Sequence, residues 1–379
     1  MSRAAESPLT ALGLMSGTSM DGIDIALLHT DGEQHIHAGA DGFTAYSAAD
    51  RAVLRAALDI AAKLPTPVLA DMALWPDELI AADACVTDLH IAAVTDFLHR
   101  HGLQNSAVDL IGLHGQTVIH RPDEGFTLQI GDAQALAGAV NIDVVAQFRH
   151  ADMAAGGQGA PLAPLFHNAL VQNALVGAER PQAVLNLGGI ANLSWFGADD
   201  ALLAFDTGPA NALIDDWMAA HGGAAFDKDG ALAAQGTVDE TALSALLDNA
   251  YFAQRPPKSL DRLAFDRQPV AALSAADGAA TLTAFTAHSI ALGLAQCPAM
   301  PTQLILCGGG RHNKTLCAML AQLVPCTLVD CDALGWHGDA LEAQLFAWLA
   351  VRSRYGLPLS RPETTGVKTP ISGGVLFRP

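Results

Sequence analysis

The stretch Met15-Ser16-Gly17-Thr18-Ser19-Met20-Asp21-Gly22-Ile23-Asp24 is a polar, glycine-rich turn between two apolar runs, residues 9–15 and 23–28. Two short apolar runs joined by a tight polar turn predict a β-hairpin. A turn rich in glycine, serine and threonine gathers backbone N–H groups and hydroxyls, and glycine lets a ligand approach the backbone closely. The pattern indicates a hairpin that suits a polyphosphate, although an ordinary hairpin turn also explains it.

A second unit of the same kind occurs in the other half of the chain. Residues 183–187 are apolar, Gly188-Gly189 forms a turn, and residues 190–196 are apolar again. The repetition favours phosphate binding at both turns, and it predicts a degenerate duplication with a boundary near residues 177–182. Further strands are expected at residues 108–113, 202–205 and 303–307, and helices at 48–64, 77–102, 165–176, 211–221, 281–296 and 339–355. The fold class is therefore α/β.

Length and composition argue against several classes of function. The length of 379 residues suggests two domains at about 150 residues each. With 20 basic and 39 acidic residues, the net charge of −19 argues against general binding to nucleic acid or anionic membranes. The six cysteines form no CxxC pair, which argues against a zinc knot or a disulfide framework. Because the chain has no signal-peptide run and no long apolar stretch, we expect a cytoplasmic protein.

Familiar nucleotide and metal motifs are missing from the sequence. There is no G-x-x-x-x-G-K-[ST], and neither glycine cluster, residues 156–159 or 308–310, completes G-x-G-x-x-G before a helix. HExxH is also absent. A P-loop enzyme and a dinucleotide dehydrogenase are therefore disfavoured, and the two glycine hairpins and the third glycine turn remain as the candidate nucleotide site.

These motifs carry a resemblance that runs in order from Gly13 to about Gly366. The chain is similar to the anhydro-N-acetylmuramic acid kinases. Besides the opening turn, the similar stretches are His114-Gly115-Gln116-Thr117, Phe148-Arg149 with Asp152, Ala155-Gly156-Gly157-Gln158-Gly159-Ala160-Pro161-Leu162, Asn186-Leu187-Gly188-Gly189-Ile190-Ala191-Asn192-Leu193, Phe205-Asp206-Thr207-Gly208-Pro209-Ala210-Asn211, Cys307-Gly308-Gly309-Gly310 with Asn313, and Glu342-Ala343 with Phe346-Ala347-Trp348-Leu349-Ala350.

The resemblance implies two duplicated ribonuclease-H-like (actin-like ATPase) domains around a nucleotide and sugar cleft. It also implies that ATP phosphorylates 1,6-anhydro-N-acetylmuramic acid while water opens the anhydro ring, giving N-acetylmuramic acid 6-phosphate and ADP in murein recycling. A homodimer is the family expectation. The ATP-binding residues implied in this way are Gly17, Thr18, Ser19, Met20, Asp21, Gly22, Ile23, Asp24, Gly188, Gly189, Gly308, Gly309, Gly310 and Asn313.

Two aspartates beside the first turn are candidate metal ligands. Asp21 and Asp24 could hold Mg²⁺ through water, because this ion takes oxygen ligands and keeps several waters. The alternative is a solvated turn aspartate that caps its own backbone.

Asp206 is the candidate catalytic residue. It follows an apolar strand and precedes a Gly-Pro turn into a helix, and ligands of α/β folds bind beyond the strand ends. An Asx-turn residue that starts the helix is the alternative. With the resemblance added, Asp206 becomes the general base that takes a proton from the water attacking the anomeric carbon, while the released O6 attacks the γ-phosphate.

The remaining site residues are assigned to the sugar, and each has a structural alternative. Arg149 could pair with the lactyl carboxylate, or it could be an ordinary surface arginine. His114 follows a buried strand, where a hydrogen-bonded structural histidine is common. Glu342 stands in a D-x-x-E capping pattern with Asp339 and could be wholly structural. The substrate-binding residues are predicted to be His114, Gln116, Arg149, Asp152, Gly157, Gln158, Gly159 and Glu342.

The sequence departs from the family pattern in two places. Ala210 stands where the family commonly has glycine, and Leu260-Asp261 replaces Thr-Gly in the segment 257–265. We expect an N-terminal domain of residues 1–176 and a C-terminal domain of residues 177–352, with residues 353–379 returning to the first. A kinase for another hexose or amino sugar, or an actin-like ATP-driven binding switch, would share the phosphate turns.

Overall fold

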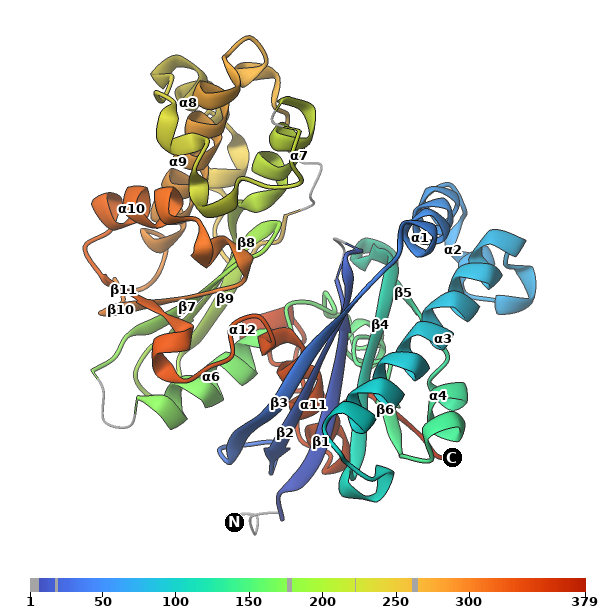
Figure 1. The fold of residues 1–379 in the computed structure, drawn as a ribbon. Coiled ribbons are helices and arrows are strands. Elements are labelled where there is room, and N and C mark those ends of the chain that lie inside the picture. The colour runs from blue at the N-terminus through green and yellow to red at the C-terminus, as the bar shows by residue number, and fades with distance from the viewer. Residues whose placement is uncertain (1–6, 18–19, 176–178, 222, 261–264) are drawn as a thin grey trace. The chain divides into compact units, whose positions relative to one another are not determined.

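The structure, a computed structural model, describes residues 7–17, 20–175, 179–221, 223–260 and 265–379. The chain forms two compact units, each with its own sheet (Figure 1). Unit 1 comprises Met1–Ala174 and Ala340–Pro379, and unit 2 comprises Leu175–Asp339. No helix among the described residues combines the length and the apolar character that a membrane span requires.

The sheet of unit 1 has the strand order β12-β6-β4-β1-β2-β3, with β5 paired to β4. The strands β1, β2 and β3 form an antiparallel meander, and β4 and β6 run parallel to β1. The strand bounds are Leu9–Ser16 for β1, Gly22–Thr30 for β2, Ile36–Ala45 for β3, Leu110–Arg121 for β4, Phe126–Ile130 for β5, Val144–Ala146 for β6 and Val375–Phe377 for β12.

The sheet of unit 2 has the order β11-β10-β7-β8-β9. The strands β7, β8 and β9 are again an antiparallel meander, and β10 and β11 run parallel to β7. The five-strand pattern β3-β2-β1-β4-β6 of unit 1 is thus repeated as β9-β8-β7-β10-β11, which confirms the predicted duplication. The bounds are Gln182–Leu187 for β7, Ile190–Phe196 for β8, Leu202–Pro209 for β9, Gln303–Cys307 for β10 and Thr327–Asp330 for β11.

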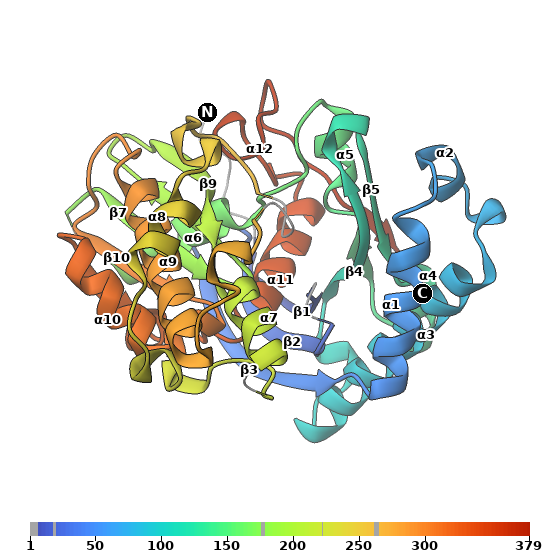
Figure 2. The ribbon, with the colours of Figure 1, turned by 90° about the horizontal axis from the view of Figure 1, so that it is seen from above.

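Helices cover both faces of the sheet in unit 1. The alternating residues Leu12, Leu14, Ile23 and Ile25 face a core that also contains residues of the helices α1 and α3. The helix α11 packs on the opposite face, along β1, β2 and β4 (Figure 2). The bounds are Ala48–Ala61 for α1, Thr66–Leu69 for α2, Asp77–Arg100 for α3, Ala133–Val140 for α4, His150–Ala154 for α5, Ala163–Ala174 for α6, Leu341–Arg354 for α11 and Pro362–Thr365 for α12.

Two glycines allow the close approach of α11 to the sheet. A Cβ atom at Gly13 would lie 1.8 Å from the carbonyl oxygen of Ala343, and one at Gly112 would lie 2.1 Å from that of Phe346. Any side chain at either position would push the helix away. The backbone of α11 therefore lies directly on β1 and β4, which fixes the position of its N-terminal turn.

In unit 2, the long helix α9 is the centre of the helical layer. Most of its residues are buried, and it packs against β9 and against α7, α8 and α10. The bounds are Asn211–His221 for α7, Glu240–Leu247 for α8, Ala275–Leu294 for α9 and Lys314–Leu323 for α10.

Two predicted strands are longer than the sequence indicated. The strand β4 continues to Arg121, so His114 and Gln116 lie within it rather than beyond its end. The strand β9 continues to Pro209, so Asp206 is also inside a strand. In both cases the strand continues because a neighbour pairs with the added residues: β5 pairs with β4 from Gln116 onward, and β8 pairs with β9 as far as Pro209.

The predicted capping box at the last helix is wrong. The helix α11 begins at Leu341 with Ala340 at the N-cap, and no side chain caps it. Asp339 instead forms an ion pair with Arg311, with 2.6 Å between Oδ1 and Nη1. A buried guanidinium is a stronger partner for a carboxylate than a helix N–H group, because both groups are charged.

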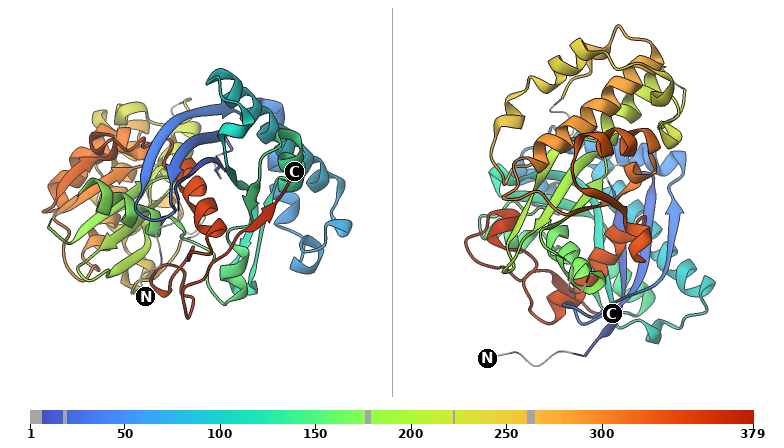
Figure 3. Two further views of the ribbon diagram at one scale, coloured as in Figure 1. Left: turned by 90° about the horizontal axis from the view of Figure 1, so that it is seen from below. Right: turned by 90° about the vertical axis from the view of Figure 1, so that its left-hand side faces the viewer.

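The chain returns to unit 1 earlier than the expected domain limits imply. We expected residues 177–352 to form one domain, but α11 packs on the sheet of unit 1, and the division falls between Asp339 and Ala340. The C-terminal strand β12 then pairs antiparallel with β6 (Figure 3). Sequence position alone hid this return, because α11 follows the last strand of unit 2 after only a short segment.

Candidate active site

The first glycine turn joins β1 to β2 in unit 1 and is held by a chain of buried hydrogen bonds. The Gln116 amide nitrogen donates to the carbonyl of Gly17 (3.2 Å), and Gln116 Oε1 accepts from the Ser16 hydroxyl (2.5 Å). The Tyr46 hydroxyl lies 2.7 Å from Ser16 Oγ, and the Tyr46 N–H donates to the carbonyl of Asp21 (2.8 Å). Gln116 is fully buried, so the structure places it beneath the turn. Thr18 and Ser19 lie outside the described residues.

The candidate metal ligands both sit at the β2 end of the same turn, Asp21 directly before the strand and Asp24 within it. Asp21 is exposed, and Asp24 is half-buried on β2, opposite Met15 of β1. Ile23 and Ile25 point into the core with α1 and α3. Since side chains alternate along a strand, Asp24 lies on the other face, the one that α11 covers. Met20, which directly precedes Asp21, has a left-handed φ of 53°.

His114 and Arg149 meet on the α11 face of unit 1. The His114 ring packs on Phe346 of α11, with 4.5 Å between ring centroids. Arg149 Nη2 lies 3.0 Å from His114 Nε2, and Arg149 Nη1 donates to the carbonyl of Gly159 (2.9 Å). Because a guanidinium can only donate, His114 Nε2 accepts, and the ring is neutral. Burial and the charge of Arg149 accordingly hold the pKa of His114 well below its ordinary value.

Arg149 keeps donors for a ligand. In the described part of the chain, these contacts use two of its five N–H groups. Burial lowers its pKa to about 10, while Glu342 and Asp152 oppose this shift by their charge. The guanidinium remains charged at neutral pH, so it can still pair with an anion.

Asp152 is enclosed by protein rather than open to a ligand. One carboxylate oxygen accepts from the N–H of Gly159 (2.7 Å), and the other accepts from the hydroxyls of Ser360 and Thr365. A Cβ atom at Gly157 would lie 2.2 Å from Asp152 Oδ1. The structure thus gives Asp152 the task of shaping the segment 157–159, whose Gly159 carbonyl in turn holds Arg149. Gln158 is exposed, and its N–H donates to the carbonyl of Thr365 (2.8 Å).

Glu342 occupies the second position of α11 and is exposed. Its charge raises the pKa of Arg149, so the two side chains share one electrostatic environment. The structure therefore brings His114 and Arg149 together on one face of unit 1, with Glu342 in the first turn of the helix that covers this face. Asp152 holds the segment whose Gly159 carbonyl accepts from Arg149. The sequence did not identify Ser360 and Thr365, since the return of the C-terminal segment to this unit gives them their place.

In unit 2 the second and third glycine turns contact each other. A Cβ atom at Gly308 would lie 2.3 Å from Asn186 Oδ1, and Gly308 has a positive φ of 76°. A Cβ atom at Gly310 would lie 2.7 Å from the Cβ atom of Leu187. Glycine is thus required at both positions, because the turn after β10 lies directly against the end of β7. The turn Gly188-Gly189 is bound to the start of α7, since the N–H of Asn211 donates to the carbonyl of Gly188 (3.0 Å).

Asn313 has a structural task. Its side-chain oxygen accepts from the N–H of Leu316 (2.9 Å), which makes it the N-cap of α10. Asn313 is also buried. The predicted contact with ATP would therefore have to compete with a cap that typically contributes about 1 kcal/mol.

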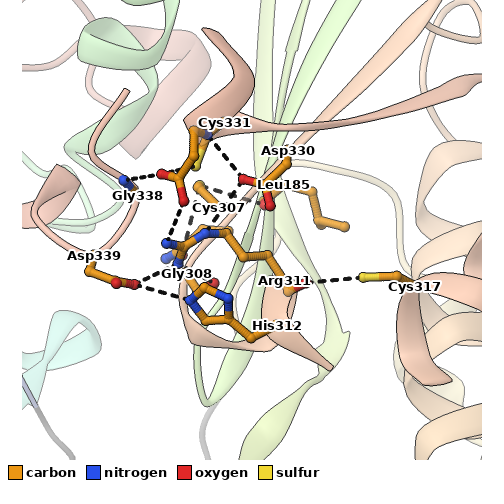
Figure 4. Close-up of polar contacts among 12 residues, drawn as sticks. Leu185, Cys307, Gly308, Arg311, His312, Cys317, Asp330, Cys331, Gly338 and Asp339 are labelled. Atoms are coloured by element: carbon orange, nitrogen blue, oxygen red, sulfur yellow. Dashed lines mark hydrogen bonds and ion pairs between the residues drawn. The ribbon is translucent and has the colours of Figure 1, made fainter. Parts of the chain in front are cut away.

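Arg311, which the sequence analysis missed, is a buried cation at the third turn that is surrounded by three exposed carboxylates (Figure 4). Its side chain is only 2% exposed, and it pairs with Asp339 (2.6 Å) and Asp332 (3.1 Å), with Asp330 at 3.6 Å. Nη1 also donates to the carbonyl of Gly308 (3.2 Å). The hydrogen bond and charge of Arg311 lower the pKa of Asp339. Against a desolvation penalty, the N–H of Gly338 and then Arg311 lower the pKa of Asp332. Only the adjacent glycine motif could have drawn attention to it.

Asp206 is half-buried on β9 and held from several sides. The Asn192 side-chain amide donates to one carboxylate oxygen, and the N–H of Leu260 donates to the other (2.7 Å). The Tyr251 hydroxyl donates to the backbone carbonyl of Asp206 (2.6 Å), and the backbone N–H of Asp206 donates to the carbonyl of Lys258 (3.0 Å). Burial raises the pKa of Asp206 to about 6, although both carboxylate hydrogen bonds favour the charged form. A carboxylate with this pKa is ionised at neutral pH and is an effective proton acceptor.

Of the residues that depart from the family pattern, Leu260 contacts this carboxylate, and Asp261 lies outside the described residues. Lys258 donates to the carbonyl of Tyr251 (3.1 Å) and lies 4.5 Å from the Tyr251 ring centroid, so its cation is engaged within the protein. Leu260 contributes only its N–H to Asp206. Ala210 is fully buried, and its N–H donates to the carbonyl of Gly189 (3.0 Å). Its methyl group therefore packs into the core of unit 2.

Gly309 offers a direct test of close approach by a nucleotide. Apart from the two adjacent residues, no described atom lies within 4 Å of a Cβ atom built there. The same holds for Gly138 on α4, apart also from the backbone of its own helix. If the nucleotide contacts the backbone at this turn, we expect Gly309→Ala to raise the KM for ATP about tenfold, or 1.4 kcal/mol, with no loss of melting temperature. Gly138→Ala is the matched control. An unchanged KM in Gly309→Ala would exclude close approach at this turn.

The sequence comparisons assign the chain to one family. The family described as "Anhydro-N-acetylmuramic acid kinase" matches residues 9–379. The chain belongs to the anhydro-N-acetylmuramic acid kinase family. As a member it is a kinase, a phosphotransferase that uses ATP and acts on a sugar, and its substrates are small molecules.

Curated members of the anhydro-N-acetylmuramic acid kinase family match almost the whole chain. The protein of that name from Rhizorhabdus wittichii is 53% identical over 374 residues, covering 98% of this chain and 99% of its own. The protein of that name from Rhodopseudomonas palustris is 48% identical over 372 residues, covering 98% of this chain and 100% of its own. Among solved structures, component A of (R)-2-hydroxyglutaryl-CoA dehydratase from Acidaminococcus fermentans is 12% identical with a TM-score of 0.46, covering 90% of this chain and 99% of its own. At that score the structural likeness adds nothing to the assignment.

Proposed function

We propose that the enzyme phosphorylates 1,6-anhydro-N-acetylmuramic acid at O6 while water opens the anhydro ring, with Asp206 as the general base. The observation that carries this proposal is the environment of Asp206, a carboxylate whose pKa burial raises to about 6 and whose two oxygens are each fixed by one donor. A base of this kind suits the removal of a proton from water at neutral pH.

The proposed reaction balances without any further group. Asp206 takes one proton from the water as its oxygen bonds to the anomeric carbon. The bond between that carbon and O6 breaks, and O6 attacks the γ-phosphorus as ADP leaves. The products are N-acetylmuramic acid 6-phosphate, ADP and one proton. Positioning and charge stabilisation supply the rest of the catalysis, since phosphoryl transfer needs little covalent help.

ATP binding is assigned to the three glycine turns. Two of them, Gly188-Gly189 and Gly308–Gly310, lie in contact within unit 2, where only glycine fits at positions 308 and 310. Backbone N–H groups of such turns bind phosphate oxygens without a charged side chain. Since ATP is supplied in the cytoplasm, we also propose that the enzyme acts there. A homodimer remains a family expectation.

Magnesium would be held by Asp21 and Asp24, whose carboxylate oxygens are the ligands that this ion prefers. The fit is supported by the exposure of Asp21 and by the position of both residues, three apart, where the first turn enters β2. When bound, Mg²⁺ would neutralise charge on the phosphates of ATP.

The sugar is assigned to the α11 face of unit 1. Arg149 offers a charged guanidinium that is fixed by His114 and Gly159, and this suits the lactyl carboxylate of the muramic acid. Glu342 is exposed beside it and suits the hydroxyl or amide groups of the sugar. His114, Gln116 and Asp152 support this proposal indirectly, because their buried contacts hold the turn and Arg149 in place.

Mass spectrometry of the product tests the function. We expect the purified enzyme with ATP, Mg²⁺ and 1,6-anhydro-N-acetylmuramic acid to give N-acetylmuramic acid 6-phosphate, with one oxygen from H₂¹⁸O at the anomeric carbon. A phosphorylated product that keeps the anhydro ring would contradict the coupled mechanism. ATP turnover that is indifferent to the sugar would point to a nucleotide switch instead.

A further inference from the structure

Asp206 lies on an edge strand of the sheet in unit 2, beside an irregularity in the pairing. The strand β9 is the last in the order β11-β10-β7-β8-β9, so no strand of this sheet pairs with its outer edge among the described residues. Asp206 pairs with Asn192 of β8. Gly208, two residues further along β9, pairs with Ala191, the next residue of β8. Thr207 is therefore an extra residue, a β-bulge, and such a bulge disrupts the ladder of hydrogen bonds locally.

Tyr251 and residues 258–260 cover the outer edge of β9 at Asp206. In an antiparallel sheet, the N–H and C=O groups of one residue point to the same side of its strand. The N–H of Asp206 donates to the carbonyl of Lys258 (3.0 Å), and its carbonyl accepts from the Tyr251 hydroxyl (2.6 Å). These partners take the places that a neighbouring strand would take. The N–H of Leu260 adds a contact to the carboxylate itself (2.7 Å).

The side chain of Lys258 joins the two parts of this cover. Its Nζ donates to the carbonyl of Tyr251 (3.1 Å) and lies 4.5 Å from the centroid of the Tyr251 ring, which is a cation–π contact. Each of the residues Asp206, Tyr251 and Lys258 therefore contacts the other two. Burial and the charge of Asp206 raise the pKa of Tyr251, so its hydroxyl is protonated and can donate to the carbonyl.

The two parts of the cover differ in how firmly they are supported. Tyr251 is buried in a 3₁₀ turn, Ala250–Ala253, and its ring meets that of Phe265 edge to face, with 6.2 Å between centroids. Phe265 in turn packs on Phe285 of α9 (5.5 Å). Residues 258–260 belong to no helix or strand. Their position along β9 therefore depends on contacts such as those with Asp206 and Tyr251.

We propose that Tyr251 and Lys258 are positioning residues that hold residues 258–260 along β9, where the N–H of Leu260 fixes one carboxylate oxygen of Asp206. The inference rests on the proposed role of Asp206 as the general base and adds the residues that orient this base. A base must lie within hydrogen-bond reach of the proton that it removes, so the carboxylate needs a fixed orientation. The hydroxyl and the ammonium both bind backbone carbonyls, so they should act on proton transfer rather than on the binding of ATP or the sugar.

The test compares two variants with two matched controls. Tyr251→Phe removes the hydroxyl and keeps the ring, and Lys258→Met removes the ammonium and keeps an unbranched side chain. In the controls Tyr355→Phe and Gln296→Met, the lost donor also binds a backbone carbonyl. The Tyr355 hydroxyl binds one in unit 1 (2.7 Å), and the Gln296 amide binds one in the same 3₁₀ turn as Tyr251 (2.6 Å). The kcat, both KM values, the pH dependence of kcat/KM and the melting temperature are measured for each.

We expect Tyr251→Phe and Lys258→Met each to lower kcat about tenfold, the effect of losing one hydrogen bond of average strength, with little change in either KM. A weaker contact from Leu260 favours the charged carboxylate less, so the acidic limb of kcat/KM should move to higher pH. Lys258→Arg keeps a cation and a donor and should recover most of the lost kcat. The double variant should lose little more than the weaker single variant, because both changes act on the same segment.

Two sets of results separate this inference from the proposed function. If both variants melt lower but keep the kcat and pH profile of the wild type, or if the controls change kcat and the profile equally, Tyr251 and Lys258 are merely structural and the inference is wrong. Losses of kcat that multiply in the double variant would contradict a shared role. If Asp206→Asn keeps a near-normal kcat, the proposed base itself is wrong, and this inference is overturned with it.

Discussion

Replacement of Asp206 by asparagine is expected to lower kcat by about 10²- to 10⁴-fold, the usual contribution of a general base. Asparagine has the same shape but cannot take the proton from water. Asparagine can accept from only one of the two donors, Asn192 and Leu260, because its NH2 group cannot accept, so some loss of melting temperature is expected. The KM values for ATP and the sugar should change little. Ring opening and phosphorylation should be lost together, since the same proton transfer starts both.

Asp227→Asn is the matched control for this variant. Asp227 is a buried carboxylate of unit 2 that accepts from the N–H groups of Leu232 (2.8 Å) and Ala233 (2.9 Å). Its replacement should lower stability without lowering kcat. Near-normal kcat in Asp206→Asn would mean that another carboxylate is the base, and Glu342 would be the next to test. Normal kcat with a sharply lower melting temperature would assign Asp206 a purely structural role.

The pH profile gives an independent check of the same residue. Because burial raises the pKa of Asp206 to about 6, the wild-type kcat/KM should fall as the pH drops through that value and the base becomes protonated. Asn192 donates to the carboxylate and so favours the charged form. Asn192→Ala should therefore move this acidic limb to higher pH. If the acidic limb of kcat/KM does not move in this variant, the limb reflects the ionisation of a group other than Asp206.

The hairpins with their glycine turns could be predicted from the sequence because the pattern that forms them is local. The pattern of an apolar run, glycines and a second apolar run fixes a hairpin locally, and its repetition at Gly188-Gly189 indicated the duplication that the two sheet orders confirm. Residues whose role depends on distant partners were harder. Arg311 pairs with three carboxylates that follow it by 19 to 28 residues, and no local pattern announces such a cluster.

The ends of two strands and the start of the last helix also could not be predicted from local sequence patterns. Pairing with β5 and β8 extends β4 and β9 beyond the apolar runs, so His114 and Asp206 lie inside strands that local hydrophobicity did not reveal. The Asp339 and Glu342 spacing matched a capping box, but Arg311 draws Asp339 away from the helix end. In each case a tertiary contact outweighs a local preference, which for the helix cap is about 1 kcal/mol.

Replacement of Arg149 by methionine is expected to raise the KM for 1,6-anhydro-N-acetylmuramic acid about 10- to 100-fold with little change in kcat. Hydrogen bonds to charged groups contribute roughly 1.5–3 kcal/mol, and a guanidinium can form two at once with a carboxylate. Arg121→Met is the matched control, since Arg121 also donates to a backbone carbonyl in unit 1, that of Leu64 (3.0 Å). Its replacement should leave the sugar KM unchanged.

A sugar analogue can distinguish two roles of Arg149, namely pairing with the lactyl carboxylate of the substrate and holding the segment around Gly159. Arg149 also holds the carbonyl of Gly159 and the ring of His114, so its loss could disturb the site indirectly. The analogue 1,6-anhydro-N-acetylglucosamine lacks the lactyl carboxylate, and the wild type should therefore bind it about as weakly as Arg149→Met binds the full substrate. If Arg149 pairs with the carboxylate, the variant should lose almost nothing further on this analogue, as a double-mutant cycle requires of two coupled groups. Equal losses on both sugars would show that Arg149 acts through Gly159 and His114 alone.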